Sequence, residues 1–332
     1  MSTATDIGIA DRGGKRPLLE VRDLTMRYTT RAGEVSAVDR VSFSVERGEA
    51  LGLVGESGCG KSSIAITLLK LLPENASILE GEILIDGVDI APMSEERMLE
   101  YRWARVSMVF QAAMNSLDPV YRVGDQIIEA LEYHVESAPD EALERVRQLY
   151  DLVSLDRVFI PRYPHEYSGG MKQRAIIAMA LACEPDLIIA DEPTTALDVI
   201  VQDHILREMK KVQRELDMGM IYISHDMAVI AEVSDVVGVM YAGKIVEFGD
   251  ARGIFENPIH PYTRALMSAF PSVSGEKREL TTLGGEPPNL LDPPSGCRFH
   301  PRCTYATDEC FTQEPPIVWR GERWAACWNP PE

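Results

Sequence analysis

The spacing of apolar residues changes along the chain, and each change predicts a different kind of element. Apolar and polar positions alternate through LLEVRDLTMRY, from Leu18, and through VSAVDRVSFSV, up to Val45, as in half-buried antiparallel strands. EALGLVG then leads into GESGCGKSSIAITLLKLLP, which predicts a buried strand, a tight loop and a helix ended by Pro73. GEILIDGVDI predicts a hairpin that turns at Asp86 and Gly87. The chain therefore begins with a β-rich segment.

A helical period replaces this pattern between about Val123 and Leu155, in VGDQIIEALEYH and PDEALERVRQLYDLVSL. After it, helices (MKQRAIIAMALA, VQDHILREMKKVQREL) alternate with apolar strands (DLIIAD, MIYISHD). Such alternation indicates a mostly parallel sheet covered on both faces. We therefore expect an α/β fold with an antiparallel β subdomain, a mostly parallel core sheet and an α-helical subdomain at about residues 112–175.

Composition predicts where the α/β domain begins and ends. Residues 1–17 are polar and patternless and are expected to form a disordered lead. More than half of the 21 prolines lie after Asn257, in a stretch with little helical periodicity. We therefore predict an α/β domain over residues 18–257 and a small irregular extension over residues 258–332.

The charge balance excludes some classes of protein. The 33 basic and 52 acidic residues give a net charge of −19, which argues against nucleic acid as the main partner. No apolar run approaches the ~20 residues of a membrane span, and the N-terminal stretch carries charges where a signal peptide is apolar. The sequence predicts a cytoplasmic protein that lies beside a membrane only through a partner.

The segment GESGCGKS, from Gly55 to Ser62, matches the phosphate loop of nucleotide-binding proteins in its expected context between a strand and a helix. Its glycines let backbone N–H groups surround phosphates, and the helix start adds partial positive charge. Lys61 is expected to reach the β- and γ-phosphates of ATP, and Ser62 to bind Mg²⁺. The predicted nucleotide-binding residues here are Gly55, Glu56, Ser57, Gly58, Cys59, Gly60, Lys61, Ser62 and Ser63.

Polar side chains follow three predicted strands, where ligands of open α/β sheets bind. Asp191 and Glu192 end DLIIADE; Asp191 is expected to hold Mg²⁺ through water, and Glu192 to act as general base on the attacking water. His225 ends MIYISH and is expected to donate to the γ-phosphate or the water. Gln111 ends VSMVFQ and is expected to contact Mg²⁺ or water. The alternatives are a helix-capping carboxylate, a structural histidine and a plain strand-end amide.

These motifs, in this order, resemble the ATP-binding subunit of an ABC transporter over residues 18 to 250. The resemblance implies that ATP lies between two such domains arranged head to tail, that Tyr28 stacks on adenine, and that the loop TALD, ending at Asp198, lies near the nucleotide. It also implies that Ser168, Gly169 and Gly170 bind the γ-phosphate held by the partner domain. The alternative for these three is an N-capping serine followed by flexible glycines.

Further segments are similar to the D-type ATPase of dipeptide and oligopeptide importers: QAAMNSLDP, SGGMKQR, ADEPTTALDV, IFENPIHPYTRAL and the tail GCRFHPRCTYATDEC. That resemblance implies a related F-type ATPase partner, two permeases and an external binding protein, with this subunit peripheral on the cytoplasmic face of the membrane. It implies peptide import, with oligosaccharides or nickel as alternative cargo. The alternative of another class is a soluble ABC ATPase without a permease, but such chains generally have two ATPase halves or a long coiled-coil insertion.

Four of the six cysteines, Cys297, Cys303, Cys310 and Cys327, lie in the tail. A disulfide framework is unusual in a cytoplasmic protein, and a proline-rich segment with little apolar material needs a staple. The clustering therefore indicates a metal site, and the subfamily resemblance implies a [4Fe-4S] cluster; zinc and unligated or disulfide-paired cysteines are the alternatives.

At two places the sequence departs from the family pattern, and at each we expect a change in chemistry or in contacts. Cys59 stands where the family usually has serine, and a helix start is expected to lower its thiol pKa and make the loop sensitive to oxidation. Ala112 and Ala113 follow Gln111 where the subfamily often has an acidic residue and then a small residue or proline. We expect the contact with the permease to differ in detail there.

Overall fold

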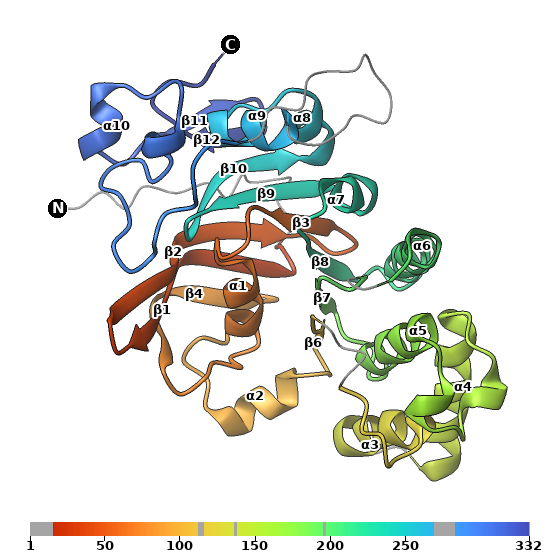
Figure 1. Ribbon diagram of the computed structural model, residues 1–332. Helices are drawn as coiled ribbons and strands as arrows, with labels where there is room; N and C mark the ends of the chain where they lie inside the picture. Colours follow the sequence, from red (N-terminus) through yellow and green to blue (C-terminus); the bar gives the residue numbers. More distant parts are fainter. Residues whose placement is uncertain (1–15, 112–115, 136–137, 195–196, 269–282, 332) are drawn as a thin grey trace. The chain divides into compact units, whose positions relative to one another are not determined.

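The computed structural model describes residues 16–111, 116–135, 138–194, 197–268 and 283–331. Most of the predicted disordered lead, and Ala112 and Ala113, lie outside these ranges. The chain divides into two compact units (Figure 1). The first unit comprises Met1–Val45, Leu51–Pro92 and Ile223–Glu332, and the second comprises Glu46–Ala50 and Met93–Tyr222.

The N-terminal part of the first unit is a four-stranded antiparallel sheet in the order β2-β1-β4-β5. Its strands are β1 (Leu19–Thr30), β2 (Gly33–Val45), β4 (Ala76–Ile85) and β5 (Val88–Asp89). The predicted hairpin is present between β4 and β5, where Asp86 and Gly87 have positive φ angles of 48° and 78°. Two successive positive φ angles are typical of the turn that joins twisted antiparallel strands most tightly.

The rest of the first unit contains the strand that leads into the phosphate loop. β3 (Ala50–Val54), which lies in this unit from Leu51 on, is buried along its whole length and pairs in parallel with β9 (Val236–Tyr241). β10 (Lys244–Asp250) pairs antiparallel with β9. The helices of this unit are α1 (Lys61–Leu68), α7 (Met227–Val233), α8 (Ala251–Glu256), α9 (Pro261–Ser268) and α10 (Asp308–Thr312).

The segment after Asn257, which the sequence predicts to be a small irregular extension, groups with the first unit. β12 (Arg323–Ala326) pairs with β10, and β11 (Ile317–Arg320) pairs with β12. The rings of Phe248 on β10 and Trp324 on β12 stack with their centroids 6.2 Å apart. Strands of four residues offer too few positions for an alternating pattern to show, which is why the sequence did not reveal them.

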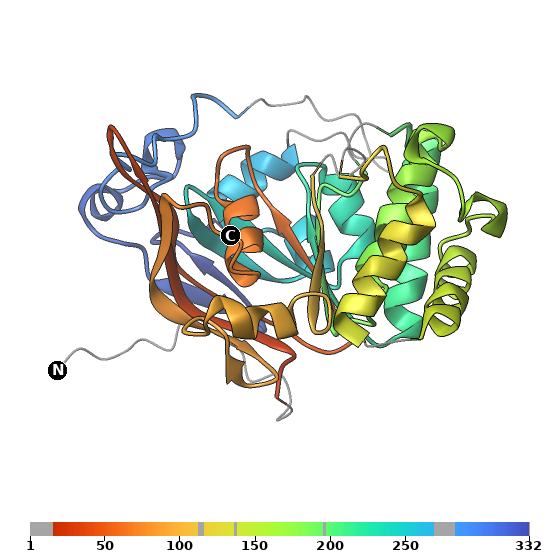
Figure 2. The ribbon, with the colours of Figure 1, turned by 90° about the horizontal axis from the view of Figure 1, so that it is seen from below.

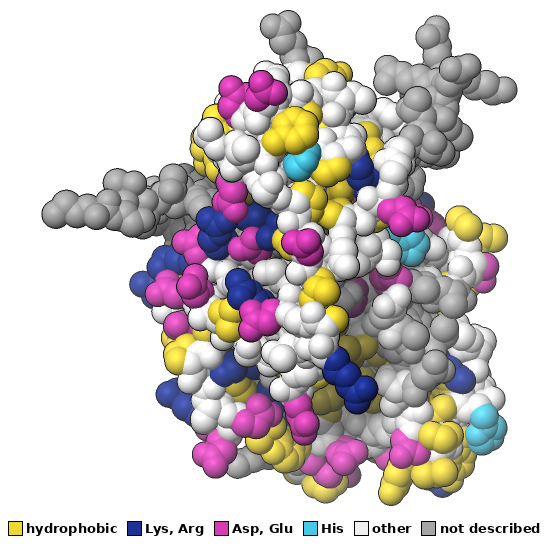
Figure 3. All heavy atoms as spheres, turned by 60° about the vertical axis from the view of Figure 1, so that its left-hand side comes forward, with side chains coloured by type: hydrophobic (Ala, Val, Ile, Leu, Met, Phe, Trp, Pro, Cys, Tyr) yellow, Lys and Arg dark blue, Asp and Glu magenta, His cyan; other side chains and the backbone are white. Residues whose placement is uncertain are grey.

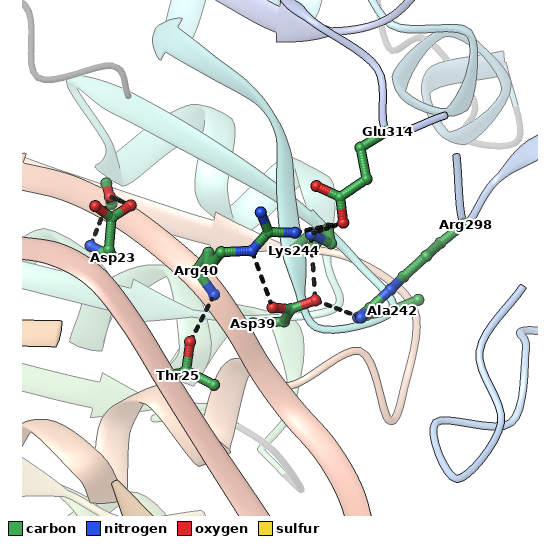
Figure 4. Close-up of polar contacts among 9 residues, drawn as sticks. Asp23, Thr25, Asp39, Arg40, Ala242, Lys244, Arg298 and Glu314 are labelled. Atoms are coloured by element: carbon green, nitrogen blue, oxygen red, sulfur yellow. Dashed lines mark hydrogen bonds and ion pairs between the residues drawn. The ribbon is translucent and has the colours of Figure 1, made fainter. Parts of the chain in front are cut away.

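Charged side chains also attach this extension to the rest of the first unit (Figure 4). Asp39 on β2 forms ion pairs with Arg298 of the extension and with Lys244 on β10, the latter at 3.2 Å. Glu314 of the extension pairs with Arg40 and, at 3.2 Å, with Lys244. Burial raises the pKa of Asp39, but Lys244 and Arg298 outweigh it and hold that pKa below its usual value. The extension is therefore attached through partly buried charges as well as through strand pairing.

The second unit contains three neighbouring strands in the order β8-β7-β6 and a group of helices. The strands are β6 (Val106–Val109), β7 (Leu187–Asp191) and, up to Tyr222, β8 (Gly219–Ile223). β6 and β7 run parallel, with Val109 opposite Ala190. α2 (Glu95–Tyr101) precedes β6, and α6 (Val199–Glu215) lies between β7 and β8 in the chain.

The predicted helical insertion is present in the second unit. α3 (Val123–Val135), α4 (Pro139–Leu152) and α5 (Gly169–Ala180) pack side by side, drawn from yellow to green in Figure 2. Two short 3₁₀ turns, Arg157–Phe159 and Pro164–Glu166, connect α4 to α5. α4 buries Ala142, Val146, Leu149 and Tyr150. This spacing of three and four residues places the apolar side chains on one helix face.

On the face shown in Figure 3, Lys and Arg side chains lie among Asp and Glu side chains. Among the helices that the structure describes, none combines the length and the apolar character needed to cross a membrane.

Candidate nucleotide site

The phosphate loop connects β3 to α1, and its backbone is tightly constrained. Gly55 and Gly60 have φ angles of 152° and 110°, and Gly60 is the N-cap residue of α1. A Cβ atom on Gly55 would lie 2.2 Å from the carbonyl oxygen of Met240, and one on Gly60 would lie 2.2 Å from that of Ala37. Only glycine fits at either position, so the local packing requires the glycine spacing of the motif.

Lys61 opens α1, and its ammonium group is held against the loop. Its Nζ donates to the carbonyl oxygen of Gly55 at 2.7 Å and to that of Glu56 at 3.1 Å. The Lys61 side chain is buried, whereas Ser57 and Ser62 are exposed. The first N–H groups of a helix lack intrahelical acceptors. An anion at this helix start therefore meets N–H donors and the Lys61 ammonium together.

The pKa of the Cys59 thiol is shifted in the direction opposite to the prediction. Its side chain is buried, and burial raises the pKa of the thiol even though the Lys61 ammonium, 3.5 Å from Sγ, acts to lower it. The expected lowering of this pKa was wrong, because desolvation of the thiolate outweighs the helix start and the lysine. Cys59 is therefore a protonated, packed thiol and not a reactive one.

Tyr28 lies on β1 and reaches toward α1. Its hydroxyl is 3.2 Å from Oγ of Ser63, and its side chain is half-buried. This contact connects the antiparallel sheet to the residue that follows the phosphate loop motif. Stacking of Tyr28 on adenine stays a prediction.

In the second unit, Gln111 and Glu192 follow the carboxyl ends of the adjacent parallel strands β6 and β7. Nε2 of Gln111 donates to Oε2 of Glu192 at 2.9 Å. Glu192 has a φ angle of 47°, a left-handed conformation that is uncommon for residues other than glycine. Strained backbone of this kind is concentrated at functional sites. Asp191, the last residue of β7, is buried with 4% of its surface exposed.

Two helices of the second unit begin at predicted site residues. Ser168 is the N-cap of α5, and its Oγ accepts a hydrogen bond of 3.3 Å from the backbone N–H of Met171. The capping role that was the alternative for Ser168 is therefore present. Capping uses only the Ser168 hydroxyl. The N–H groups of Gly169 and Gly170 lie in the first turn of α5, where a helix offers them no acceptor, so capping leaves them able to bind an anion. Both Ser168 and Gly169 are exposed.

Asp198 caps α6 in the same way, accepting a hydrogen bond of 3.0 Å from the N–H of Val201. Of the loop TALD, Thr195 and Ala196 lie outside the described residues. His225 follows β8, is exposed and belongs to the first unit. The structure thus brings Gln111 to Glu192 within the second unit, and Lys61 to the phosphate loop within the first.

The four tail cysteines form no disulfide in the part of the chain that the structure describes. The backbone N–H of Cys297 donates to the carbonyl oxygen of Cys310 at 2.9 Å. Sγ of Cys303 and Sγ of Cys310 accept from the backbone N–H groups of Tyr305 at 3.4 Å and Thr307 at 3.5 Å. Burial raises the pKa of Cys297 to about 11, and the neighbouring thiols Cys310 and Cys303 add to the rise.

No single-ion metal site is present among residues 16–111, 116–135, 138–194, 197–268 and 283–331. Nowhere there do three or more His, Cys, Asp or Glu side chains stand in positions from which they could hold a metal ion. A zinc ion needs four ligands at about 2.0–2.3 Å. Within these ranges the structure therefore supports neither the zinc alternative nor the predicted [4Fe-4S] cluster, which stays a prediction.

Sequence reasoning missed two residues that contact the phosphate loop from the extension. The hydroxyl of Tyr262 accepts from the N–H of Glu56 at 3.0 Å, and Arg302 pairs with the Glu56 carboxylate. Tyr262 and Arg302 lie 206 and 246 residues after Glu56, inside segments that resemble the peptide importers but that give no sign of a contact with the loop. No spacing pattern in the sequence indicates these contacts.

Comparison with known families and proteins shows which class of protein this chain resembles. A family model described as "ABC transporter" matches residues 38–195, and one described as "Oligopeptide/dipeptide transporter, C-terminal region" matches residues 246–310. The oligopeptide transport ATP-binding protein OppD of Escherichia coli K12 is 44% identical over 317 residues, covering 95% of this chain and 94% of OppD. OppD of Bacillus subtilis 168 is 46% identical over 305 residues, covering 90% and 85%.

Solved structures of ABC transporter ATPases have the same fold as this chain. The dimeric ABC transporter cassette MJ0796 superposes with a TM-score of 0.64 at 26% identity, covering 71% of this chain and 99% of that one. CbiO1 of Clostridium perfringens, part of the transporter complex cbiONQ, gives 0.64 at 26%, covering 73% and 92%. The chain belongs to the ABC transporter family of ATPases. The two relatives named above are oligopeptide transport ATP-binding proteins. These findings confirm the predicted fold class and the predicted resemblance.

Proposed function

We propose that this ATPase powers the import of oligopeptides through a membrane permease. The contact that carries the proposal is the hydrogen bond of Gln111 to Glu192, in a chain that also has a complete phosphate loop and a peptide-transporter C-terminal region. A carboxylate held at the end of a buried strand by a neighbouring amide suits a general base that acts on water beside a bound nucleotide. Peptide as cargo is supported by the names of the relatives.

The proposed roles follow from the chemistry of each group. Lys61 and the N–H groups at the start of α1 bind the β- and γ-phosphates of ATP, and His225 donates to the γ-phosphate or to the attacking water. Glu192 accepts a proton from that water, and Gln111 holds the Glu192 carboxylate in place. Tyr28 stacks on the adenine ring.

The donor set also suits Mg²⁺. Ser62 offers an exposed hydroxyl, Gln111 an amide oxygen and Asp191 a carboxylate, all of them the oxygen ligands that Mg²⁺ prefers. When bound, Mg²⁺ neutralises charge on the phosphates. These three residues would hold it, Asp191 through water.

We propose that ATP is bound between two ATPase subunits arranged head to tail, with Ser168, Gly169 and Gly170 facing the partner's phosphate loop and Asp198 close by. The exposed start of α5 supports this, as does the dimer formed by the related cassette MJ0796. The partner would be a related F-type ATPase, beneath two permeases served by an external binding protein. The subunit would be peripheral on the cytoplasmic face of the membrane.

We also propose that Cys297, Cys303, Cys310 and Cys327 hold a [4Fe-4S] cluster with a structural role. In such a cluster each thiolate binds a different iron, so the sulfurs stand further apart than around a single ion. The N–H···S hydrogen bonds at Cys303 and Cys310 are of the kind that surround cluster thiolates.

Transport by the reconstituted complex tests the function. Proteoliposomes that contain the two ATPases, the permeases and the binding protein are offered labelled tripeptide, trisaccharide or Ni²⁺ in turn, with ATP on the side of the ATPases. We expect ATP-dependent accumulation of the peptide alone. Accumulation of the trisaccharide or of Ni²⁺ without peptide would identify the alternative cargo, and a chain that hydrolyses ATP at the same rate without the permeases would indicate a soluble ATPase.

A further inference from the structure

We propose that Arg302 of the C-terminal extension is a positioning residue for the phosphate loop, so that the extension sets the ATP affinity of its own subunit. This inference rests on the proposed function, because it assigns a role in ATP binding. The contact that carries it lies entirely within the first unit, between the extension and the second residue of the loop.

The contact is a two-pronged ion pair. Nη1 of Arg302 lies 2.6 Å from Oε2 of Glu56, and Nη2 lies 2.9 Å from Oε1. The Arg302 side chain is 5% exposed and that of Glu56 is 25% exposed. Parallel bonds between a guanidinium and a carboxylate are strong and directional. At this low exposure, solvent screens the pair only weakly.

Every polar group of Glu56 is engaged. Its carboxylate binds Arg302, its N–H donates to the hydroxyl of Tyr262 at 3.0 Å, and its carbonyl oxygen accepts from Lys61 at 3.1 Å. Two of these three partners belong to the extension, and the third is the lysine of the phosphate loop. A displacement of Glu56 would therefore move an acceptor of Lys61.

The extension holds Arg302 itself at several points. Arg302 ends a 3₁₀ turn, His300–Arg302, and its Nε donates to the carbonyl oxygen of Gly284 at 2.9 Å. Phe299, just before that turn, is 2% exposed, and its ring centroid lies 5.2 Å from that of Tyr241 and 5.3 Å from that of Tyr262. The aromatic cluster thus anchors the start of the turn that carries Arg302, and Nη1 of Arg302 also donates to the hydroxyl of Tyr241 on β9 at 3.4 Å.

Charge explains why the loop needs this arginine. A carboxylate in a loop that surrounds phosphates repels them, and the repulsion is stronger where solvent is partly excluded. Arg302 supplies the opposite charge directly against the Glu56 carboxylate. Removal of the Arg302 guanidinium alone leaves a negative charge on Glu56 that repels the triphosphate. Removal of both the guanidinium and the Glu56 carboxylate leaves no such charge.

The test is a double-mutant cycle on the full-length chain, with Mg-ATP binding measured by titration. Arg302→Gln is expected to weaken ATP binding about tenfold, and Glu56→Gln combined with Arg302→Gln to restore most of that loss. Arg302→Lys, which keeps the charge without the two-pronged geometry, is expected to fall between. Arg320→Gln, a control whose guanidinium binds the carbonyl oxygen of Pro331 in the same extension, is expected to bind ATP as the wild type does.

Turnover by the assembled transporter gives a second measurement. Arg302→Gln is expected to raise the KM for ATP while kcat stays close to the wild-type value. Unchanged ATP binding in Arg302→Gln, or equal losses in the single and double variants, would overturn the charge-positioning role. A wild-type chain that binds no ATP would instead overturn the proposed function.

Discussion

The side-chain amide of Gln111 donates to the carboxylate of Glu192 at 2.9 Å, so the ends of the adjacent parallel strands β6 and β7 share one hydrogen bond. Glu192 holds this position with a φ angle of 47°. Backbone in this conformation fixes the direction of the side chain, and the amide of Gln111 then fixes its carboxylate. The pair joins two of the residues to which we assign a role in hydrolysis.

Replacement of Glu192 by glutamine is expected to leave ATP binding intact and to lower turnover about 10²- to 10⁴-fold, the usual effect of losing a general base. Glutamine keeps the shape of the side chain but cannot accept the proton of the attacking water. Turnover is measured with the assembled transporter, and ATP binding with the isolated chain.

Glu184→Gln is the matched control, since Glu184 has a φ angle of 52° in the same unit and is exposed. It should hydrolyse ATP like the wild type. Wild-type turnover by Glu192→Gln would show that the subunit opposite supplies the active base.

Ser168→Arg is expected to abolish hydrolysis at the partner's phosphate loop while ATP affinity of the isolated chain stays unchanged, because the start of α5 is proposed to act across the interface. Ser94→Arg is a fitting control. Ser94 is likewise an exposed N-cap, for α2, and its Oγ accepts from the N–H of Arg97 at 3.4 Å. If Ser168→Arg instead removes ATP binding from the isolated chain, the stretch serves its own site.

Features that depend on neighbouring residues were predictable from the sequence, and contacts between distant residues were not. The phosphate loop, the hairpin at Asp86 and Gly87 and the helical insertion were predictable, because each depends on local spacing and turn chemistry. The Arg302–Glu56 pair was not, since a contact between distant residues leaves no periodic trace. The pKa of Cys59 was predicted in the wrong direction, because local sequence cannot show that the side chain is buried.

The tail is expected to yield about four iron and four sulfide per chain after anaerobic purification, with the broad visible absorption of an iron–sulfur protein. Alanine at Cys297, Cys303, Cys310 and Cys327 should remove the colour and make the tail sensitive to protease. Matched alanine at Cys183, a half-buried cysteine outside the tail, should leave both unchanged. Colourless protein with one zinc per chain would exclude the cluster.

Stability is expected to fall on mild acidification because of His260, which is buried in the first unit and accepts the N–H of Tyr262 through Nδ1 at 3.0 Å. Burial lowers its pKa from 6.5 to about 3. As the pH falls, His260 therefore takes up a proton near pH 6.5 in the unfolded chain but only near pH 3 in the folded chain. At about pH 5 this difference lowers the free energy of unfolding by about 2 kcal/mol.

Urea unfolding near neutral pH and at about pH 5 measures this loss. Glu247 contributes in the opposite direction, because burial raises its pKa, so the comparison is made with His260→Gln in an otherwise unchanged chain. The variant should lose less stability on acidification than the wild type. Equal losses would show that His260 takes up its proton in the folded state.

The most direct test of an ATPase that powers peptide import is the rate of Mg-ATP hydrolysis by the reconstituted transporter, with and without peptide-loaded binding protein. We expect the loaded binding protein to stimulate hydrolysis, and Lys61→Ala in this subunit to abolish the stimulation, because Lys61 is the buried cation of the phosphate loop. A rate that does not respond to the loaded binding protein, or a stimulation that survives Lys61→Ala, would contradict the proposed role.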